Sequence, residues 1–190
     1  MGDKFKGMKY LRFNTRFKGR LNYAYKLGLG EGSQKKNVLD IGTGVGYFPY
    51  ICNRLGHNAM AFDLGDYELF NDMIDMLGVH RPVYSIEAFE PIPDQGLKFD
   101  LVTAFLICFN NHNKPGLWGV PEWEYFFKDL ALNHISENGG VFLHFNYEAD
   151  TNLPYSDELK RYFMENGGEI ELNEVSFKSM HAFRQKETRS

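Results

Sequence analysis

The segment from Val38 to Tyr47 constrains the fold of this 190-residue chain more than any other stretch. An apolar run ends in an acid, Asp40, and is followed by three glycines at alternate positions, 42, 44 and 46. Apolar residues then recur at the i, i+3, i+4, i+7 spacing of a helix with one buried face, at Phe48, Ile51, Cys52 and Leu55. A strand, a glycine turn and a helix in this order predict an α/β unit whose backbone can approach a ligand closely.

The spacing of these glycines distinguishes two classes of cofactor site. The dinucleotide fingerprint G-x-G-x-x-G would need its last glycine at Tyr47. The chain instead has D-x-G-x-G-x-G, which resembles the first motif of class I S-adenosylmethionine (SAM)-dependent methyltransferases. The resemblance implies that the turn passes against the methionine part of SAM and that Asp40 contacts its charged amino-acid part, directly or through water. It assigns five residues here to the cofactor: Asp40, Gly42, Thr43, Gly44 and Gly46. A glycine-rich turn of another α/β protein is the alternative.

A second acid follows the next apolar segment. Residues 58–62 are predicted to form a short buried strand, and Asp63 stands directly after it, 21 residues beyond Gly42. In nucleoside-binding α/β folds an acid at about this distance binds the ribose hydroxyls. The resemblance gives Asp63 that role and places Leu64 on the adenine. The competing acid, Asp66, is expected to cap the next helix.

Two further segments resemble the family. Val83–Ile86 is predicted to be the third strand, after which Glu87 would accept a hydrogen bond from the adenine amine and the Ala88 N–H would reach a ring nitrogen. An exposed acid in a proline-rich loop is the alternative for Glu87. Residues 98–106 are predicted to be the fourth strand, and they contain Phe-Asp-Leu-Val at 99–102, which is common in the family. Phe105, at its end, is assigned to the cofactor.

Residues beyond the fourth and fifth strands are candidates for the acceptor site, because ligands of open α/β sheets bind past the carboxyl ends of the strands. Asn110 and Asn111 could hydrogen-bond a substrate hydroxyl. His112 is the candidate general base, since imidazole accepts a proton near neutral pH; a loop histidine without chemistry is the alternative. Trp118 is expected to be an exposed side chain that forms one wall of the substrate site, and Tyr147 is expected to contact the substrate.

The expected fold class is α/β, a Rossmann-like doubly wound sheet of seven strands, mostly parallel with an antiparallel last strand, and with helices on both faces. The predicted strands are residues 38–41, 58–62, 83–86, 98–106, 141–145, 169–172 and 180–183. Residues 1–37 are expected to form an N-terminal helical cap of the same domain, helical over 10–29. The resemblance spans about residues 38–184, the expected methyltransferase domain, and leaves 185–190 as a polar tail.

Charge and cysteine content limit the partners and the compartment. Residues 1–36 hold ten Lys or Arg against two acids, which could form a positive rim for an anionic substrate or simply a solvated face. No base-reading element accompanies this charge, so duplex DNA is not expected. Only two cysteines, no membrane-length apolar run and no signal peptide predict a cytoplasmic protein that does not enter a membrane.

The sequence therefore predicts a SAM-dependent methyltransferase with S-adenosylhomocysteine as a product. The expected acceptor is a small or medium-sized molecule, anionic or linked to a sugar or nucleotide, methylated on oxygen or nitrogen rather than carbon. No metal site is expected, because the six histidines are scattered. A monomer or homodimer is expected. The alternatives are a non-catalytic SAM-binding or adaptor protein with the same fold and a nicotinamide oxidoreductase.

Overall fold

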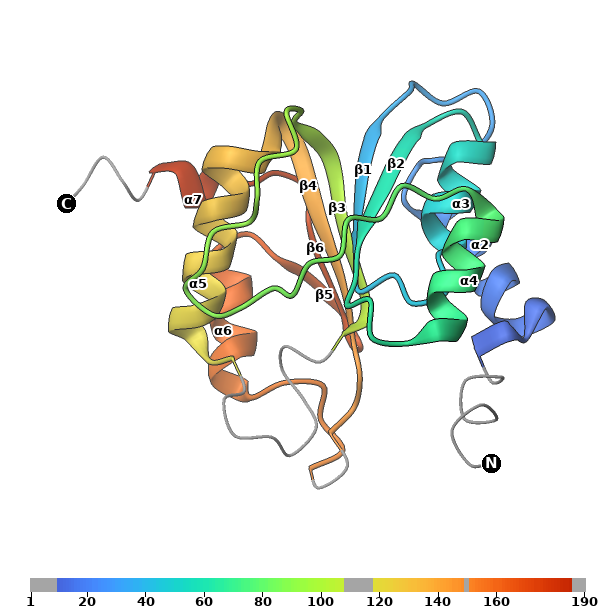
Figure 1. Cartoon of the computed structure of the whole chain (residues 1–190). Helices are drawn as coiled ribbons and strands as arrows, with labels where there is room; N and C mark the ends of the chain where they lie inside the picture. The colour runs from blue at the N-terminus through green and yellow to red at the C-terminus, as the bar shows by residue number, and fades with distance from the viewer. Residues whose placement is uncertain (1–9, 108–117, 149–150, 186–190) are drawn as a thin grey trace. The chain divides into compact units, whose positions relative to one another are not determined.

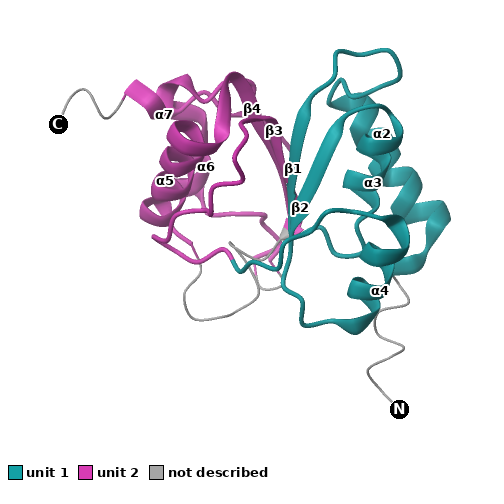
Figure 2. Ribbon diagram, turned by 45° about the horizontal axis from the view of Figure 1, so that its top comes forward, with its two compact units in different colours: residues 1–85 teal, residues 86–190 magenta. Residues whose placement is uncertain are grey.

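The computed structural model describes residues 10–107, 118–148 and 151–185 (Figure 1). The chain forms two compact units, residues 1–85 and residues 86–190, which Figure 2 distinguishes by colour. Within the described residues, no helix combines the length and the apolar character needed to span a membrane. Six strands are described, two in unit 1 and four in unit 2, where seven were predicted.

Unit 1 is built on a pair of parallel strands joined through a helix. In chain order its elements are η2 (Phe13–Phe17, a π-helical turn), α2 (Lys18–Lys26), β1 (Asn37–Ile41), α3 (Tyr47–Arg54), β2 (Asn58–Phe62) and α4 (Glu68–Leu77). Both strands are buried over their last four residues, as in a parallel sheet covered by helices. Their register pairs Asp40 with Ala61 and Ile41 with Phe62. The two strands therefore end at the same edge.

The predicted strand at Val83–Ile86 is wrong. Only a single parallel bridge joins Val83 to Asp63, flanked by hydrogen bonds from Ala61 N to His80 O and from Tyr84 N to Asp63 O, both 3.0 Å. In a parallel ladder the intervening bond would come from the nitrogen of residue 82. That residue is Pro82, which has no N–H to donate, so the pairing does not continue as a strand.

The helices of unit 1 also differ in detail from the prediction. The expected single helix over residues 10–29 is divided into η2 and α2. The residue preceding α4 is Tyr67, with an extended backbone and no side-chain cap, so Asp66 is not the N-cap. Asp66 instead donates its N–H to the Leu64 carbonyl, which turns the chain two residues before the helix begins at Glu68.

The described residues of unit 2 form four strands and three α-helices. In chain order its elements are β3 (Phe99–Ile107), α5 (Val120–Asp129), η3 (Leu130–His134, a π-helical turn), β4 (Ile135–Phe145), α6 (Asp157–Glu165), β5 (Glu169–Glu171), β6 (Glu174–Phe177) and α7 (His181–Gln185).

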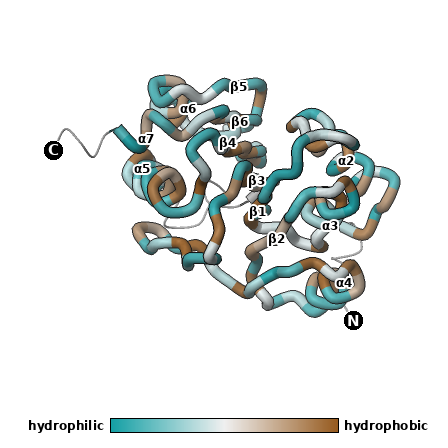
Figure 3. Tube along the Cα trace, turned by 90° about the horizontal axis from the view of Figure 1, so that it is seen from above, coloured by the Kyte–Doolittle hydropathy of each residue, from teal (hydrophilic) through white to brown (hydrophobic). Residues whose placement is uncertain are grey.

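The strands of unit 2 form a mixed set in the order β3-β4-β6-β5. Strands β3 and β4 are parallel, and β6 is antiparallel to both β4 and β5. Helices α5, α6 and α7 gather on one side of β4 (Figure 1). In Figure 3 hydrophobic and hydrophilic residues alternate along α4 and α5, as expected of helices buried on one face.

An aromatic cluster forms the core of unit 2. Trp123 of α5 meets Phe163 of α6 edge to face at 5.7 Å, and Phe163 lies 5.9 Å from Phe145 of β4. Such pairs add stability beyond the area that they bury. The cluster joins residues from five elements, all essentially inaccessible to solvent: Trp123, Phe127, Phe145, Phe163, Phe177 and Phe183. It fixes α5, α6 and α7 against β4 and β6.

The predicted strand at residues 180–183 is also wrong, because this segment begins α7. A strand would bury alternate residues, whereas the structure buries Met180 and Phe183, which are three apart as on a helix. The last strand is β6, whose Val175 and Phe177 face the core. The predicted strand at 169–172 is confirmed as β5.

Candidate functional site

A turn of three left-handed glycines joins β1 to α3. Gly42, Gly44 and Gly46 have φ of 68°, 59° and 78°, a region that L side chains enter only with strain. The Gly42 N–H donates to the Phe62 carbonyl at 2.8 Å, which links the turn to the end of β2. The Gly46 N–H donates to the Thr43 carbonyl at 3.2 Å as the helix begins. The alternating glycines of the sequence therefore correspond to alternating left-handed residues.

These glycines serve two different purposes. A Cβ added at Gly46 would lie 2.5 Å from Ile74 Cδ1 of α4, so this glycine allows close packing inside unit 1. Among the described residues, a Cβ at Gly44 would meet only Phe70 Cε2, at 3.8 Å. No side chain of the described residues fills the space beside Gly44, so its backbone can be approached by a ligand there.

The Asp63 carboxylate is held against this turn. Its Oδ2 accepts a hydrogen bond from Gly44 N at 2.5 Å, and its Oδ1 accepts one from Leu64 N at 2.7 Å. Burial raises the pKa of Asp63 above its ordinary value of 3.8, although the two N–H groups and Arg81 oppose that shift. A carboxylate has about four acceptor positions, so oxygen lone pairs remain for further donors.

Asp40 has a different environment. Its side chain is only 2% exposed, and its negative charge acts on Arg20 of α2 and Cys52 of α3. Burial lowers the pKa of Arg20, and Asp40 partly restores it. Burial also raises the pKa of the Cys52 thiol well above its ordinary value, so this cysteine stays protonated. Asp40 is thus shared with protein groups and leaves little surface for direct contact with a ligand.

The hydroxyl of Thr43 is the unexplained polar atom of the turn. Its Oγ1 is buried and has no hydrogen-bond partner among the described residues. Buried hydroxyls are nearly always paired, and an unpaired one calls for an explanation such as a water or a ligand. The turn therefore suits a small molecule that carries hydroxyl and amine groups. Asp63 offers oxygen lone pairs, the Gly44 backbone can be approached, and the Thr43 hydroxyl lacks a partner among the described residues.

Two exposed apolar side chains flank Asp63. Leu64 is 48% exposed and Val83 is 68% exposed. They border Gly65, where a Cβ would lie 2.9 Å from Val83 Cγ2. Exposed apolar side chains beside a polar group are a common feature of ligand sites.

The remaining predicted cofactor residues belong to unit 2. Glu87 is exposed, and Ala88 lies in a turn with Phe89, whose φ is 62°. Phe105 is buried and contacts Phe142 at 5.6 Å and His144 at 6.5 Å. Phe105 is therefore a core side chain of its unit. A contact of any of the three predicted residues with the cofactor remains a prediction.

Trp118 is not the exposed wall that was predicted. It is 7% exposed and packs edge to face on Trp123 at 5.3 Å and on Phe126 at 5.4 Å. Trp123 and Phe126 of α5 therefore cover its indole ring. Tyr147, two residues after the end of β4, is exposed.

Three predicted acceptor-site residues, Asn110, Asn111 and His112, lie outside the described residues. Within the described part of the chain, no cluster of three or more His, Cys, Asp or Glu could hold a metal ion.

Sequence reasoning missed a strained position at the end of β3. Leu106 has a φ of 57°, unusual for a residue with a side chain, and its carbonyl accepts a hydrogen bond from Asn146 Nδ2 at 2.8 Å. Strained residues often occur at functional sites. No local sequence signal marks this pair, because it joins residues 40 positions apart.

Comparison of the whole chain with solved structures identifies the fold. A TehB-like SAM-dependent methyltransferase from Corynebacterium glutamicum aligns over 93% of this chain and 100% of its own, with a TM-score of 0.58 and 14% identity. A sugar N-methyltransferase from Streptoalloteichus aligns over 77% of this chain and 55% of its own, with a TM-score of 0.55 and 15% identity. A SAM-dependent methyltransferase from Clostridium acetobutylicum aligns over 74% and 56%, with a TM-score of 0.53 and 18% identity.

The chain has the α/β, Rossmann-like fold of SAM-dependent methyltransferases. It spans little more than half the length of the Streptoalloteichus and Clostridium proteins. No protein-family model matches the sequence, and no curated protein is similar to it. At these identities the likeness concerns the fold, and the activity has to be argued from the residues of the site.

Proposed function

We propose that this protein is a SAM-dependent methyltransferase acting on a small or medium-sized acceptor. The observation that carries the proposal is the Asp63 carboxylate, which accepts a hydrogen bond from Gly44 N in the glycine turn. Thr43 precedes Gly44 in that turn, and its hydroxyl has no partner among the described residues. The methyltransferase fold of the chain supports this reading. The three residues stand at the carboxyl ends of β1 and β2, where open α/β sheets bind ligands.

The residues of the turn would hold the cofactor by polar contacts. Asp63 would accept hydrogen bonds from ribose hydroxyls, and Gly44 would let the chain approach closely enough for backbone contacts. The Thr43 hydroxyl would gain the hydrogen-bond partner that it lacks among the described residues. Asp40, buried near the end of β1, would contribute its negative charge. When bound, SAM supplies an electrophilic methyl group on a sulfonium. The chain's own contribution would be orientation and exclusion of water, which suit a reaction that neutralises charge.

The acceptor is proposed to present an oxygen or nitrogen atom, because a free electron pair on the acceptor is what attacks the methyl group. One similar structure is a sugar N-methyltransferase, which supports including amines of sugars among the candidates. An acceptor hydroxyl must lose its proton, and we assign that task to His112. Replacement of His112 by alanine should lower turnover while leaving the affinity for S-adenosylhomocysteine unchanged.

Calorimetric titration with S-adenosylhomocysteine tests the cofactor site. Asp63→Ala should weaken binding by about 1–3 kcal/mol because hydrogen bonds to a charged group are lost. Asp66→Ala is the matched control: it removes an exposed acid three residues away and should leave the affinity unchanged. If the Asp63 variant binds as tightly as the natural protein, Asp63 is not part of the site.

Methyl transfer needs a separate measurement, because a SAM-binding protein without catalysis would give the same titration. Labelled SAM should transfer its methyl group to at least one member of a panel of small phenols, amines and amino sugars. Tight binding with no transfer to any acceptor would favour the binding protein over the enzyme.

A further inference from the structure

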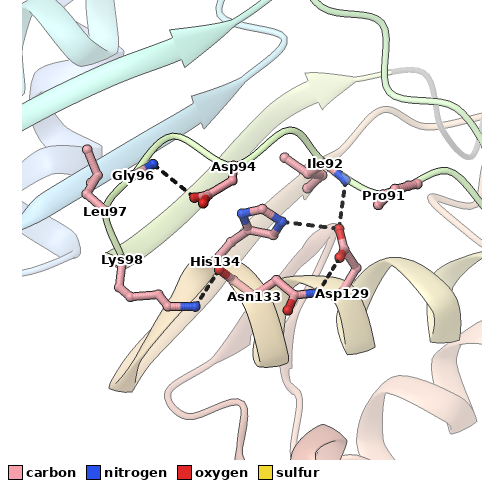
Figure 4. Close-up of a pocket in the computed structure, with 9 residues that line it drawn as sticks. All are labelled: Pro91, Ile92, Asp94, Gly96, Leu97, Lys98, Asp129, Asn133 and His134. Atoms are coloured by element: carbon pink, nitrogen blue, oxygen red, sulfur yellow. Dashed lines mark hydrogen bonds and ion pairs between the residues drawn. The ribbon is translucent and has the colours of Figure 1, made fainter.

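Unit 2 contains a pocket at the opposite edge of its strands from the carboxyl ends. It has a volume of about 480 Å³, within the range of small-molecule sites. Its lining comes from the loop of residues 91–98, which leads into the amino end of β3, and from the end of α5 and η3 (Figure 4). Because ligands of open α/β sheets bind past the carboxyl ends, this pocket is not explained by the proposed cofactor site.

A buried histidine with unsatisfied nitrogens faces this pocket. His134 is 2% exposed, and neither of its ring nitrogens has a hydrogen-bond partner in the described part of the chain. Its Nε2 lies 3.4 Å from Asp129 Oδ2 without the geometry of a hydrogen bond, and the two groups form an ion pair only when the imidazole is protonated. Figure 4 shows the other nitrogen, Nδ1, on the side of the ring away from Asp129. A buried polar atom without a partner is costly, so Nδ1 is a candidate to receive a ligand atom.

Asp129 is held in place by the protein rather than available to a ligand. Its Oδ1 accepts from Asn133 Nδ2 at 2.9 Å, and its Oδ2 accepts from Ile92 N at 2.8 Å. Burial alone would raise the pKa of Asp129, but these donors and His134 lower it below its ordinary value. The ionised carboxylate favours the tautomer of neutral His134 with its proton on Nε2. Nδ1 is then a hydrogen-bond acceptor.

The backbone at this point is irregular. Residues 130–134 form a π-helical turn directly after α5, and they include His134 and the pocket residue Asn133. Single π-helical turns are rare and occur frequently at functional sites.

The charges around the pocket do not favour an anion. Asp94 and Asp129 contribute two carboxylates against the single ammonium of Lys98. Lys98 donates to the carbonyls of Leu132 and Asn133, so its charge is directed at the end of η3. Even with His134 protonated, the lining has no excess positive charge. Pro91, Ile92 and Leu97 add apolar surface.

We propose that this pocket is a second binding site, specific for a small organic amine with an apolar body. The ammonium group would donate hydrogen bonds to His134 Nδ1 and to the Asp94 carboxylate. Asp94 accepts only one bond among those described, from Gly96 N to Oδ1 at 2.9 Å. The apolar body would lie against Ile92 and Leu97. This site does not depend on the proposed methyltransferase activity.

Ligand-observed NMR titration with three probes of equal size tests the proposal: benzylamine, benzyl alcohol and benzoate. Benzylamine should bind saturably and about tenfold more tightly than benzyl alcohol, and benzoate should bind most weakly. His134→Leu and Asp94→Asn should each weaken benzylamine at least about fivefold, because each removes one acceptor. Glu90→Gln, which removes an exposed acid of the same loop that does not line the pocket, should change nothing. Asp63→Ala should also leave benzylamine binding unchanged.

Several results would overturn the site. These are the absence of saturable benzylamine binding, benzoate binding as tightly as benzylamine, or full affinity in either pocket variant. Circular dichroism establishes whether His134→Leu is folded. If it is not, Asp94→Asn, at an exposed loop position, decides the question.

Discussion

The two units of this protein are built by different means. In unit 1 the candidate cofactor turn consists of sequence neighbours, and the contacts that define it are made largely by backbone N–H and carbonyl groups. In unit 2 the core consists of aromatic side chains from five elements, and its pocket joins a loop to a helix end more than 30 residues away. A site made of local backbone geometry can be recognised in a sequence, whereas a site made by packing requires the folded chain.

The largest expected effect tests the aromatic core. Phe163→Ala should lower the free energy of unfolding by about 3–5 kcal/mol, because it leaves a cavity among six aromatic neighbours in the described part of the chain. Met164→Ala, at the next residue and 58% exposed, should change it by less than about 1 kcal/mol. Urea unfolding followed by circular dichroism measures both. Equal effects of the two variants would mean that unit 2 is not organised around this core.

The next test separates the two kinds of glycine in unit 1. Gly46→Ala should cost about 2–3 kcal/mol, since its Cβ collides with Ile74 in a left-handed backbone. Gly44→Ala carries the backbone strain without the collision and should cost only about 1 kcal/mol. Urea unfolding of both variants checks the order. A reversed order would contradict the packing role of Gly46.

A smaller effect is expected where a single side chain binds several carbonyls. Arg184 of α7 donates through three nitrogens to the carbonyls of four residues: Ala131, Ile135, Ser136 and Glu137. Arg184→Lys keeps the charge but loses the planar fork, and should cost about 1–2 kcal/mol. The control is Arg161→Lys, at an exposed arginine with one long backbone contact of 3.5 Å. Thermal unfolding should leave the control unchanged and lower the Tm of the Arg184 variant.

The smallest effect concerns pH and Asp63. Its pKa is higher in the folded chain than the ordinary 3.8, so the folded state binds the proton more readily. Its contribution to stability is therefore present at low pH and is lost as the pH rises through the folded pKa. Asp63→Asn removes this contribution, and its free energy of unfolding should decline less than that of the natural protein as the pH rises from 3.5 to 6. Parallel pH profiles would mean that burial does not perturb this carboxyl.

The sequence alone was enough to predict the α/β class, β1, the glycine turn, α3, β2 and the position of Asp63 at a strand end. All of these follow from periodic burial and from the backbone freedom of glycine. The absence of a strand at Val83 could also have been predicted from the sequence, because Pro82 cannot donate the hydrogen bond that the parallel ladder needs.

Tertiary structure alone decided the rest. Trp118 is buried because α5 provides aromatic partners for it. The chain is helical from His181 onward, and Met180 and Phe183 are both buried in the core. The pocket beside His134 forms where the loop at Ile92 is hydrogen-bonded to Asp129. Such contacts depend on which side chains meet after distant segments pack together. The hydrophobic periodicity of the sequence predicts which face of an element is buried, but it does not predict these partners.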